Sequence, residues 1–258
     1  MRKKHFLIQT VNGRLEYDFQ QTLLNHFQWN KDLNRDFVYS LFEWDGDVHN
    51  IPTHKDTVPV GTVEFVTAYL QIAYAIHYRP INIPYTLRSF AGREFSVISL
   101  EDEIAHGWEN GFIIVDHGKT HNKFFWKSAD KMKAGYGIAN SLDEIPKNIK
   151  NVFVSELIDI ESEWRVFVHR DKIVDVKNYS GVPFRMINED IVTMAINSYK
   201  YDSTWSPSYT LDFAVTKEGR MLLIEVHNFF SCGLYGFDDV KFPYMLSQTF
   251  FHLVKSLK

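Results

Sequence analysis

The most constraining feature of the sequence is a pair of apolar runs, Tyr209–Val215 and Arg220–Val226, separated by residues 216–219. Both runs are rich in aliphatic and aromatic residues, and the short connection ends in glycine, a pattern that predicts an antiparallel hairpin. Each run carries one carboxylate, Asp212 or Glu225. Because paired strands lie side by side, the hairpin can direct both carboxylates into one site.

Two interpretations of these carboxylates are open from their spacing alone. Buried carboxylates need a counter-charge or a metal ion, and a hard cation such as Mg²⁺ prefers a few carboxylate oxygens together with waters and substrate phosphates. In the other interpretation, Asp212 ties a turn and Glu225 pairs with a core arginine.

The sequence around the hairpin extends the pattern into a sheet. Three strand-like runs precede it in quick succession, and residues 169–171 are typical of a tight turn between the last two. These runs predict an antiparallel sheet, with helical periodicity on either side of the hairpin. The strands are expected at 152–157, 164–169 and 172–177, and the helices at 189–199 and 242–257. Two earlier apolar runs, at 112–115 and 123–127, are further strand candidates.

The first third of the chain alternates between strand-like and helical patterns, which predicts a small α/β layer. Thr62 is a suitable N-cap for its second helix, and Pro80 and Pro84 then interrupt the regular pattern. We therefore predict an N-terminal domain at 1–84 and a second domain at 85–258. The expected elements are strands at 5–9 and 37–42 and a helix at 17–27, and the expected lobes of the second domain are about 85–154 and 155–258.

The composition excludes several classes of protein. The 45% of hydrophobic residues among 258 is enough to bury a core, which argues against disorder. A formal net charge of −4 lacks the basic excess of a general nucleic-acid binder, so nucleic acid is not an expected partner. No apolar run approaches the roughly 20 residues that span a bilayer, so no membrane association is expected. The single cysteine, Cys232, excludes an internal disulfide and fits a reducing, cytoplasmic location.

Four cationic side chains lie in or beside apolar runs, at Lys127, Lys133, Arg165 and Lys177. Lysines and arginines on strands that face a cleft bind phosphate oxygens, and an apolar wall strengthens them by lowering the local dielectric constant. Taken singly, each of these residues is more typical of a solvated position on a strand, but their occurrence together with the acidic hairpin favours a binding site. A short linker at Glu156 follows a strand-like run and could receive an adenine ring.

In this order the features resemble the ATP-grasp superfamily. The likeness is greatest to its compact viral and bacterial clade of predicted peptide-type ligases, named for one arginine and two lysines. It covers roughly residues 85–258, and it implies an α/β and α+β fold in which a small N-terminal pre-grasp layer precedes two α+β lobes that enclose a nucleotide. The segments that carry the likeness are Lys127–Gly135, Ser155–Ile158, Glu163–Val168, Leu211–Phe213 and Ile224–Gly236.

The resemblance also implies roles for individual residues. Lys127 and Lys133 would bind the phosphates of ATP, and Arg165 would steady the γ-phosphate or an acyl phosphate, which makes Lys133 and Arg165 the catalytic candidates. Mg²⁺, or Mn²⁺, would be bound by Asp212 and Glu225 together with Asn228 or His227. The complete set expected to contact the nucleotide is Lys127, Lys133, Glu156, Leu157, Ile158, Glu163, Arg165 and Lys177.

The metal site departs from the family at one position. The family usually has asparagine two residues after the glutamate, where this chain has His227, and Asn228 comes next. Imidazole is a poorer partner for Mg²⁺ than an amide or carboxylate oxygen. Three outcomes follow: Asn228 supplies the oxygen after a local bulge, His227 changes the metal preference or weakens the site, or catalysis has been lost.

The implied activity is that of an ATP-dependent carboxylate–amine ligase, which forms an amide through an acyl phosphate and releases ADP and phosphate. Its partners would be ATP, a carboxylate-bearing substrate and an amine acceptor such as an amino acid, a peptide or a protein. Two alternatives stay open: an ATP-dependent kinase of a small molecule or protein, and a non-catalytic nucleotide-binding module, which the departure at His227 favours.

Two further features carry less weight. His117 and His121 have a metal-ligand spacing, but the polar, glycine-containing sequence between them indicates a loop rather than a zinc-binding helix. Gly135 and Gly137 predict a flexible element and are candidates for a lid, although turns contain such glycine pairs more often.

Overall fold

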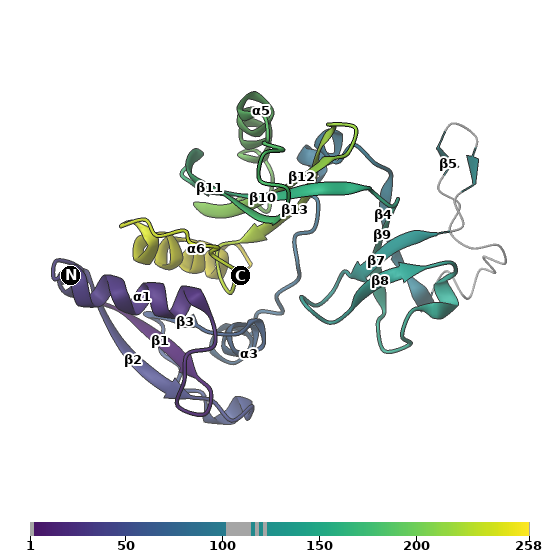
Figure 1. Ribbon diagram of the computed structural model, residues 1–258. Helices are drawn as coiled ribbons and strands as arrows, with labels where there is room; N and C mark the ends of the chain where they lie inside the picture. Colours follow the sequence, from purple (N-terminus) through teal and green to yellow (C-terminus); the bar gives the residue numbers. More distant parts are fainter. Residues whose placement is uncertain (1–2, 102–114, 117–118, 121–122, 258) are drawn as a thin grey trace.

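The computed structural model describes residues 3–101, 115–116, 119–120 and 123–257 (Figure 1). Its main parts are an N-terminal layer, a small four-stranded sheet and a large four-stranded sheet. His117, His121 and most of the strand expected at 112–115 lie outside the described residues. Within the described ranges, no helix has the length and apolar character needed to cross a membrane.

The N-terminal layer is a parallel three-stranded sheet with helices packed against it, as the alternating sequence pattern predicts. The order β2-β1-β3 places β1 in the centre, where Phe6 and Ile8 are completely buried. Helix α3 begins after Thr62, whose Oγ1 accepts a hydrogen bond from the Phe65 N–H at 3.1 Å, so the predicted N-cap is confirmed. The bounds are β1 Lys4–Thr10, α1 Asp18–Trp29, α2 Leu33–Asp36, β2 Phe37–Glu43, η1 Val48–Asn50, β3 Thr57–Val60 and α3 Val63–Tyr74.

The end of the chain completes the core of this layer. Helix α6, Phe242–Ser256, packs against it, and the rings of Phe250 on α6 and Tyr69 on α3 have centroids 6.2 Å apart. Phe229 and Phe237, in the loop before α6, belong to the same cluster. One hydrophobic core thus combines residues from both sides of the predicted boundary at residue 84, and the division into two domains stays a prediction.

The small sheet is antiparallel, in the order β4-β9-β7-β8, and includes the strand predicted at 123–127 as β7. Gly135 lies directly before β8 and Gly137 lies within it, and the flexible lid stays a prediction. A Cβ atom at Gly137 would lie 3.2 Å from the Trp126 indole, so glycine lets β8 lie against that ring. The bounds are η2 Tyr85–Phe90, β4 Phe95–Ser99, β7 Phe124–Ser128, β8 Tyr136–Ala139, η3 Leu142–Glu144 and β9 Asn151–Ser155, and β5 Val115–Asp116 pairs separately with β6 Lys119–Thr120.

The large sheet confirms the predicted hairpin and the two strands before it. Its antiparallel order is β11-β10-β12-β13. Arg170 and Asp171 have φ angles of 49° and 59°, and both form the predicted tight turn between β10 and β11. Helix α5 covers one face of the sheet and buries Ala195 and Tyr199 against it. The bounds are β10 Ile160–His169, β11 Lys172–Gly181, α5 Glu189–Tyr199, β12 Ser208–Thr216 and β13 Met221–Asn228.

An extended segment connects the N-terminal layer to the rest of the molecule. It leaves α3 and runs beside the large sheet to η2, as the blue-grey trace in the centre of Figure 1 shows. The Val226 N–H on β13 donates a hydrogen bond to the Asn82 carbonyl at 2.9 Å, so the segment is paired to β13 like a short edge strand. This pairing brings residues 78–82 close to the carboxylate-bearing end of the hairpin.

Candidate active site

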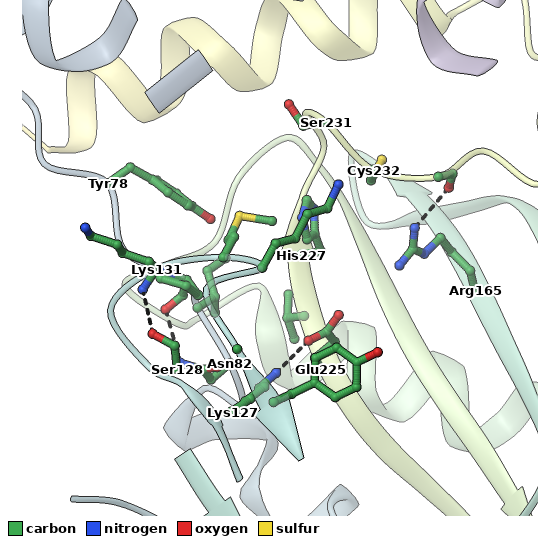
Figure 2. A pocket seen from close by; sticks show the side chains of 18 of the residues that line it. Tyr78, Asn82, Lys127, Ser128, Lys131, Arg165, Glu225, His227, Ser231 and Cys232 are labelled. Atoms are coloured by element: carbon green, nitrogen blue, oxygen red, sulfur yellow. Dashed lines mark hydrogen bonds and ion pairs between the residues drawn. The ribbon is translucent and has the colours of Figure 1, made fainter. Parts of the chain in front are cut away.

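A cavity of about 530 Å³ lies where the three parts of the molecule meet. The residues that line it come from the start of α1, the segment before η2, β7 and the loop after it, β10, and β13 and the loop after it. Figure 2 shows side chains from these elements pointing toward one another. The polar lining residues include Tyr17, Tyr78, Asn82, Lys127, Ser128, Lys131, Lys133, Arg165, Glu225, His227, Ser231, Cys232 and Tyr235.

A row of four charged side chains crosses the large sheet, with one residue from each strand. The register places Lys177 opposite Arg165, Arg165 opposite Asp212, and Asp212 opposite Glu225. Directly opposite residues in antiparallel strands project to the same face of a sheet, so the four side chains share one face. The row therefore consists of two cations followed by two carboxylates.

The centre of this row is a buried two-point ion pair between Arg165 and Asp212. Arg165 Nε donates to Asp212 Oδ1 at 2.8 Å and Nη2 donates to Oδ2 at 2.6 Å, while Asp212 is only 2% exposed. Burial alone would lower the pKa of Arg165, but the charge of Asp212 and its hydrogen bonds raise that pKa above its usual value. The third guanidinium nitrogen, Nη1, donates to the Gly233 carbonyl at 2.9 Å. The arginine is thus held rigidly at the cavity wall.

Two tyrosine rings lie beside the Arg165 guanidinium. The ring centroids of Tyr235 and Tyr179 lie 5.3 Å and 5.7 Å from its central carbon, and the two rings stack on each other at 5.0 Å. The Tyr179 hydroxyl donates to Glu163 Oε2 at 2.8 Å. Glu163, expected at the nucleotide, therefore holds one of the rings beside Arg165.

The other carboxylate of the row, Glu225, is paired with Lys127 on the small sheet. Lys127 Nζ lies 2.6 Å from Glu225 Oε2, and this ion pair links β7 to β13 across the cavity (Figure 2). Burial would raise the pKa of Glu225, but the Lys127 ammonium outweighs burial and lowers that pKa to about 2. The carboxylate is therefore ionised at neutral pH, and the two sheets are joined by one charge pair at the active-site wall.

His227 lies two residues after Glu225, on the same face of β13, and lines the cavity. Burial, together with the nearby Arg165 charge, lowers its pKa to about 4, so the ring is neutral at pH 7. Its Nδ1 contacts the Asn228 carbonyl, a bond in which the ring must be the donor. Nε2 therefore keeps a free lone pair, as a metal ligand or a hydrogen-bond acceptor requires.

Asn228 occupies a different position from His227. No register shift occurs between Glu225 and Asn228, so strand alternation directs the Asn228 side chain to the opposite face. Asn228 is 3% exposed, and its Nδ2 donates to the Tyr78 hydroxyl at 3.1 Å. Its Oδ1 is buried without a hydrogen-bond partner among the described residues. No local bulge turns this oxygen toward Glu225, and its role as a metal ligand stays a prediction.

The loop between β7 and β8 contributes further cations to the wall. Lys133 has a left-handed φ of 57°, and its Nζ lies 5.1 Å from the centroid of the Tyr17 ring. The base of the loop is fixed because Asp130 Oδ2 accepts two hydrogen bonds from Asn151, at 2.8 and 3.2 Å. Lys131, which sequence analysis missed, also lines the cavity. The signal was present, since Lys131 lies between the two predicted lysines.

The predicted adenine-binding linker joins β9 of the small sheet to β10 of the large sheet. Glu156 is fixed there, since its N–H donates to the Glu94 carbonyl at 3.1 Å and its Oε2 accepts from the Glu94 N–H at 3.0 Å. Leu157 is exposed and Ile158 is partly exposed. These three residues lie outside the lining of the cavity. Of the other predicted site residues, the cavity is lined by Lys127, Lys133, Arg165, Glu225 and His227, whereas Glu163, Lys177, Asp212 and Asn228 are not part of its lining.

Cys232 lines the cavity but has the character of a small buried residue. It is 5% exposed, and burial raises the pKa of its thiol to about 11. A thiol that stays protonated at neutral pH is a poor nucleophile. Cys232 is therefore a free, buried cysteine rather than a candidate nucleophile.

The side chains fit a divalent cation that shares its coordination with phosphates. Among the described residues, no group of three or more His, Cys, Asp and Glu side chains is arranged to hold a metal ion by itself. Asp212 and Glu225 nevertheless supply carboxylate oxygens from directly opposite positions of neighbouring strands. Magnesium in nucleotide sites typically takes one or two carboxylates and completes its shell with phosphate oxygens and waters.

Comparison with known proteins decides the family. Residues 90–245 match the family described as ATP-grasp domain, R2K clade family 2, over more than half of the chain. The chain belongs to this family. The matched range contains all the residues of the charged row and Lys127. A comparison with functionally curated proteins found no match.

Solved structures confirm that this chain has the ATP-grasp fold. D-alanine–D-alanine ligase from Bacillus anthracis is 14% identical, with a TM-score of 0.54 over 98% of this chain and 99% of that one. The D-cycloserine synthetase DcsG is 12% identical, with a TM-score of 0.52 over 98% and 100%. N5-carboxyaminoimidazole synthetase from Staphylococcus aureus is 12% identical, with a TM-score of 0.53 over 88% and 71%. At these identities the likeness shows the fold.

The buried Arg165–Asp212 pair generates a prediction about stability. Asp212→Asn keeps the shape of the side chain but leaves a buried guanidinium without its counter-charge, so we expect the free energy of unfolding to fall by about 3 kcal/mol. Asp159→Asn, which breaks the exposed pair with Lys217, is the matched control and should lower it far less. Urea denaturation of both variants measures the two free energies of unfolding. Equal losses in Asp212→Asn and Asp159→Asn would contradict the claim that the buried pair stabilises the fold more than the exposed pair.

Proposed function

We propose that this ATP-grasp protein is an ATP-dependent carboxylate–amine ligase that forms an amide or peptide bond. The observation that carries the proposal is the combination of Lys127, Arg165 and Glu225 at one cavity wall, with Asp212 buried against Arg165, so that each cation is paired with one carboxylate. Such an arrangement can accept a metal-bound polyphosphate by exchanging partners, because the carboxylates then bind the metal and the lysine binds phosphate.

In this proposal, phosphates occupy the cationic part of the cavity. Lys127, Lys131 and Lys133 supply three ammonium groups from β7 and its loop. The adenine would lie toward the linker at Glu156–Ile158. Lys177, at the far end of the charged row, and Glu163, two residues before Arg165 on β10, would be the remaining nucleotide contacts. Apolar lining from Phe19, Phe125 and Met132 strengthens the charge interactions by excluding water.

Magnesium would be held by Asp212 and Glu225, with Nε2 of His227 as the additional donor on the same face. When bound, the metal supplies positive charge that offsets the charge of the phosphates. Nitrogen donors favour transition metals more than they favour Mg²⁺, so His227 gives the site a bias toward Mn²⁺ relative to an asparagine at that position.

The reaction needs positioning and charge stabilisation rather than a nucleophilic side chain. A carboxylate oxygen of the substrate attacks the γ-phosphorus of ATP, the bond to the ADP oxygen breaks, and an acyl phosphate forms. The amine nitrogen then attacks the acyl carbon, phosphate leaves with the electrons of the C–O bond, and the nitrogen loses a proton. Arg165 lies at the wall where the transferred phosphoryl group carries its charge, and Asp212 and the Gly233 carbonyl keep it oriented.

The names of the structural neighbours support this reaction class. D-alanine–D-alanine ligase and D-cycloserine synthetase have the same fold over nearly the whole chain, and the B. anthracis ligase is also known complexed with ATP, with a TM-score of 0.53. This likeness does not identify the substrates of the chain. A cytoplasmic location stays a prediction.

ADP release tests the proposal directly. Purified protein with MgATP and pooled amino acids and peptides should release ADP, and Lys127→Met should lower the rate at least about 100-fold because it removes a phosphate-binding charge. Lys147→Met, on the same lobe but outside the cavity lining, is the matched control and should keep the full rate. Mass spectrometry should find a product that equals the two substrates minus water. A substrate that instead gains a phosphate would identify a kinase.

The role of His227 is tested by its replacement with the residue usual in the family. His227→Asn should strengthen ATP binding in the presence of Mg²⁺ by roughly tenfold and reduce the advantage of Mn²⁺, because an amide oxygen suits the harder ion. Calorimetric titration of ATP with each metal ion measures this shift. If His227→Asn leaves both affinities unchanged while Asn228→Ala abolishes metal-dependent binding, Asn228 is the ligand and this assignment is wrong.

A further inference from the structure

A second hollow of about 760 Å³ adjoins the cavity. It lies between α3 of the N-terminal layer and the loop that follows β7. Tyr78, Lys131, Met132 and Lys133 line both hollows, so the two are separated only by a shared wall. We call this second hollow the α3 groove.

The α3 groove has two distinct walls. One is a face of α3 formed by Val63, Glu64, Thr67, Ala68 and Gln71, whose spacing follows the turns of the helix. The small side chains in the middle of this face leave the groove hollow. The opposite wall is formed by residues 130–134 with Lys150 and Asn151, and the remaining lining comes from Trp44, Gly46, Val48 and residues 76–79.

The charge of the groove is predominantly positive. Arg79, Lys131, Lys133 and Lys150 line it, against the carboxylates Glu64 and Asp130. The Asp130 carboxylate is already engaged by two hydrogen bonds from Asn151. Lys150 pairs with Glu101 at 3.1 Å, but both side chains are about 70% exposed, so this pair holds the lysine only weakly.

Apolar surface lies between these charges. Trp44, Val48, Ile76 and Met132 contribute to the lining, and Trp44 is partly exposed. A groove that combines separated cations with apolar side chains suits a polypeptide with acidic residues, whose side chains vary along its length. The uniformly charged backbone of a nucleic acid would meet Glu64 on the α3 wall, where like charges repel.

We propose that the α3 groove binds an acidic peptide segment and directs its carboxylate into the neighbouring cavity. This inference rests on the proposed ligase function and names the substrate class: the carboxylate-bearing substrate is a peptide or protein rather than a free amino acid. A free amino acid would need no groove beyond the cavity itself. Because Tyr78, Met132 and Lys133 line both hollows, the end of a chain bound in the groove would lie directly beside the cavity.

The experiment is fluorescence anisotropy with the full chain and no ATP. The probe is a short peptide of glutamate, alanine and glycine that carries fluorescein at its amino end and a free carboxylate at the other. We expect binding that weakens with salt, and roughly tenfold weaker binding in Arg79→Glu, because charge reversal places a carboxylate against the probe. Lys150→Glu should weaken it in the same direction. Lys147→Glu, outside the groove, is the matched control and should bind normally.

A second readout separates this inference from the proposed function. Binding of a fluorescent ATP analogue, measured in the same proteins, should be unchanged in Arg79→Glu, which also verifies that the variant is folded. If the chain binds the acidic peptide but no ATP analogue, peptide binding by the α3 groove is supported and the ligase proposal fails. If ATP analogue binds but the acidic peptide does not, the inference is overturned. Equal binding of a peptide with lysine in place of glutamate, tighter binding of a single-stranded oligonucleotide, or dimer formation through the groove would also overturn it.

Discussion

The buried ion pair between Arg165 and Asp212 is the contact on which the arrangement of the site depends. It lies on the two central strands of the large sheet, and the same guanidinium also binds the carbonyl of Gly233 in the loop after β13. That loop is tied to the N-terminal layer, since Asp18 Oδ2 accepts the Leu234 N–H at 3.0 Å. One charged group therefore connects the sheet, the cavity wall and the N-terminal layer. A buried charge with a partner on every side tolerates little displacement.

The second connection, between Lys127 and Glu225, joins the small sheet to the large one. Both charge pairs consist of a cation suited to phosphate and a carboxylate suited to a metal ion. In the proposed function, a metal-bound nucleotide would replace the internal partners of Lys127 and Glu225 with external ones of the same sign, while Arg165 and Asp212 stay paired. In our account, the ion pairs keep these buried charges satisfied before the nucleotide binds, and substrate reaches the cavity beside the loop that carries Lys131 and Lys133.

Much of the fold was predictable because its elements have strong local patterns. The hairpin at 209–226, the Thr62 cap and the turn at 169–171 follow from turn chemistry and periodicity, and the structure has all three. The partners of the charges could not be read from the sequence, because Lys127 and Glu225 are far apart along the chain and meet only when two sheets pack. The completion of the N-terminal core by α6 is non-local for the same reason. Lys131 was missed although it lies between two predicted residues.

The central claim is that Glu225 binds a metal ion which carries ATP into the site. Calorimetric titration of ATP with and without Mg²⁺, in the unaltered chain and in Glu225→Gln, tests it most directly. The account predicts that Mg²⁺ strengthens ATP binding strongly in the unaltered chain and has little effect in Glu225→Gln, because the neutral amide is a weaker ligand. Binding of ATP that is equally tight with and without Mg²⁺ in the unaltered chain would contradict it.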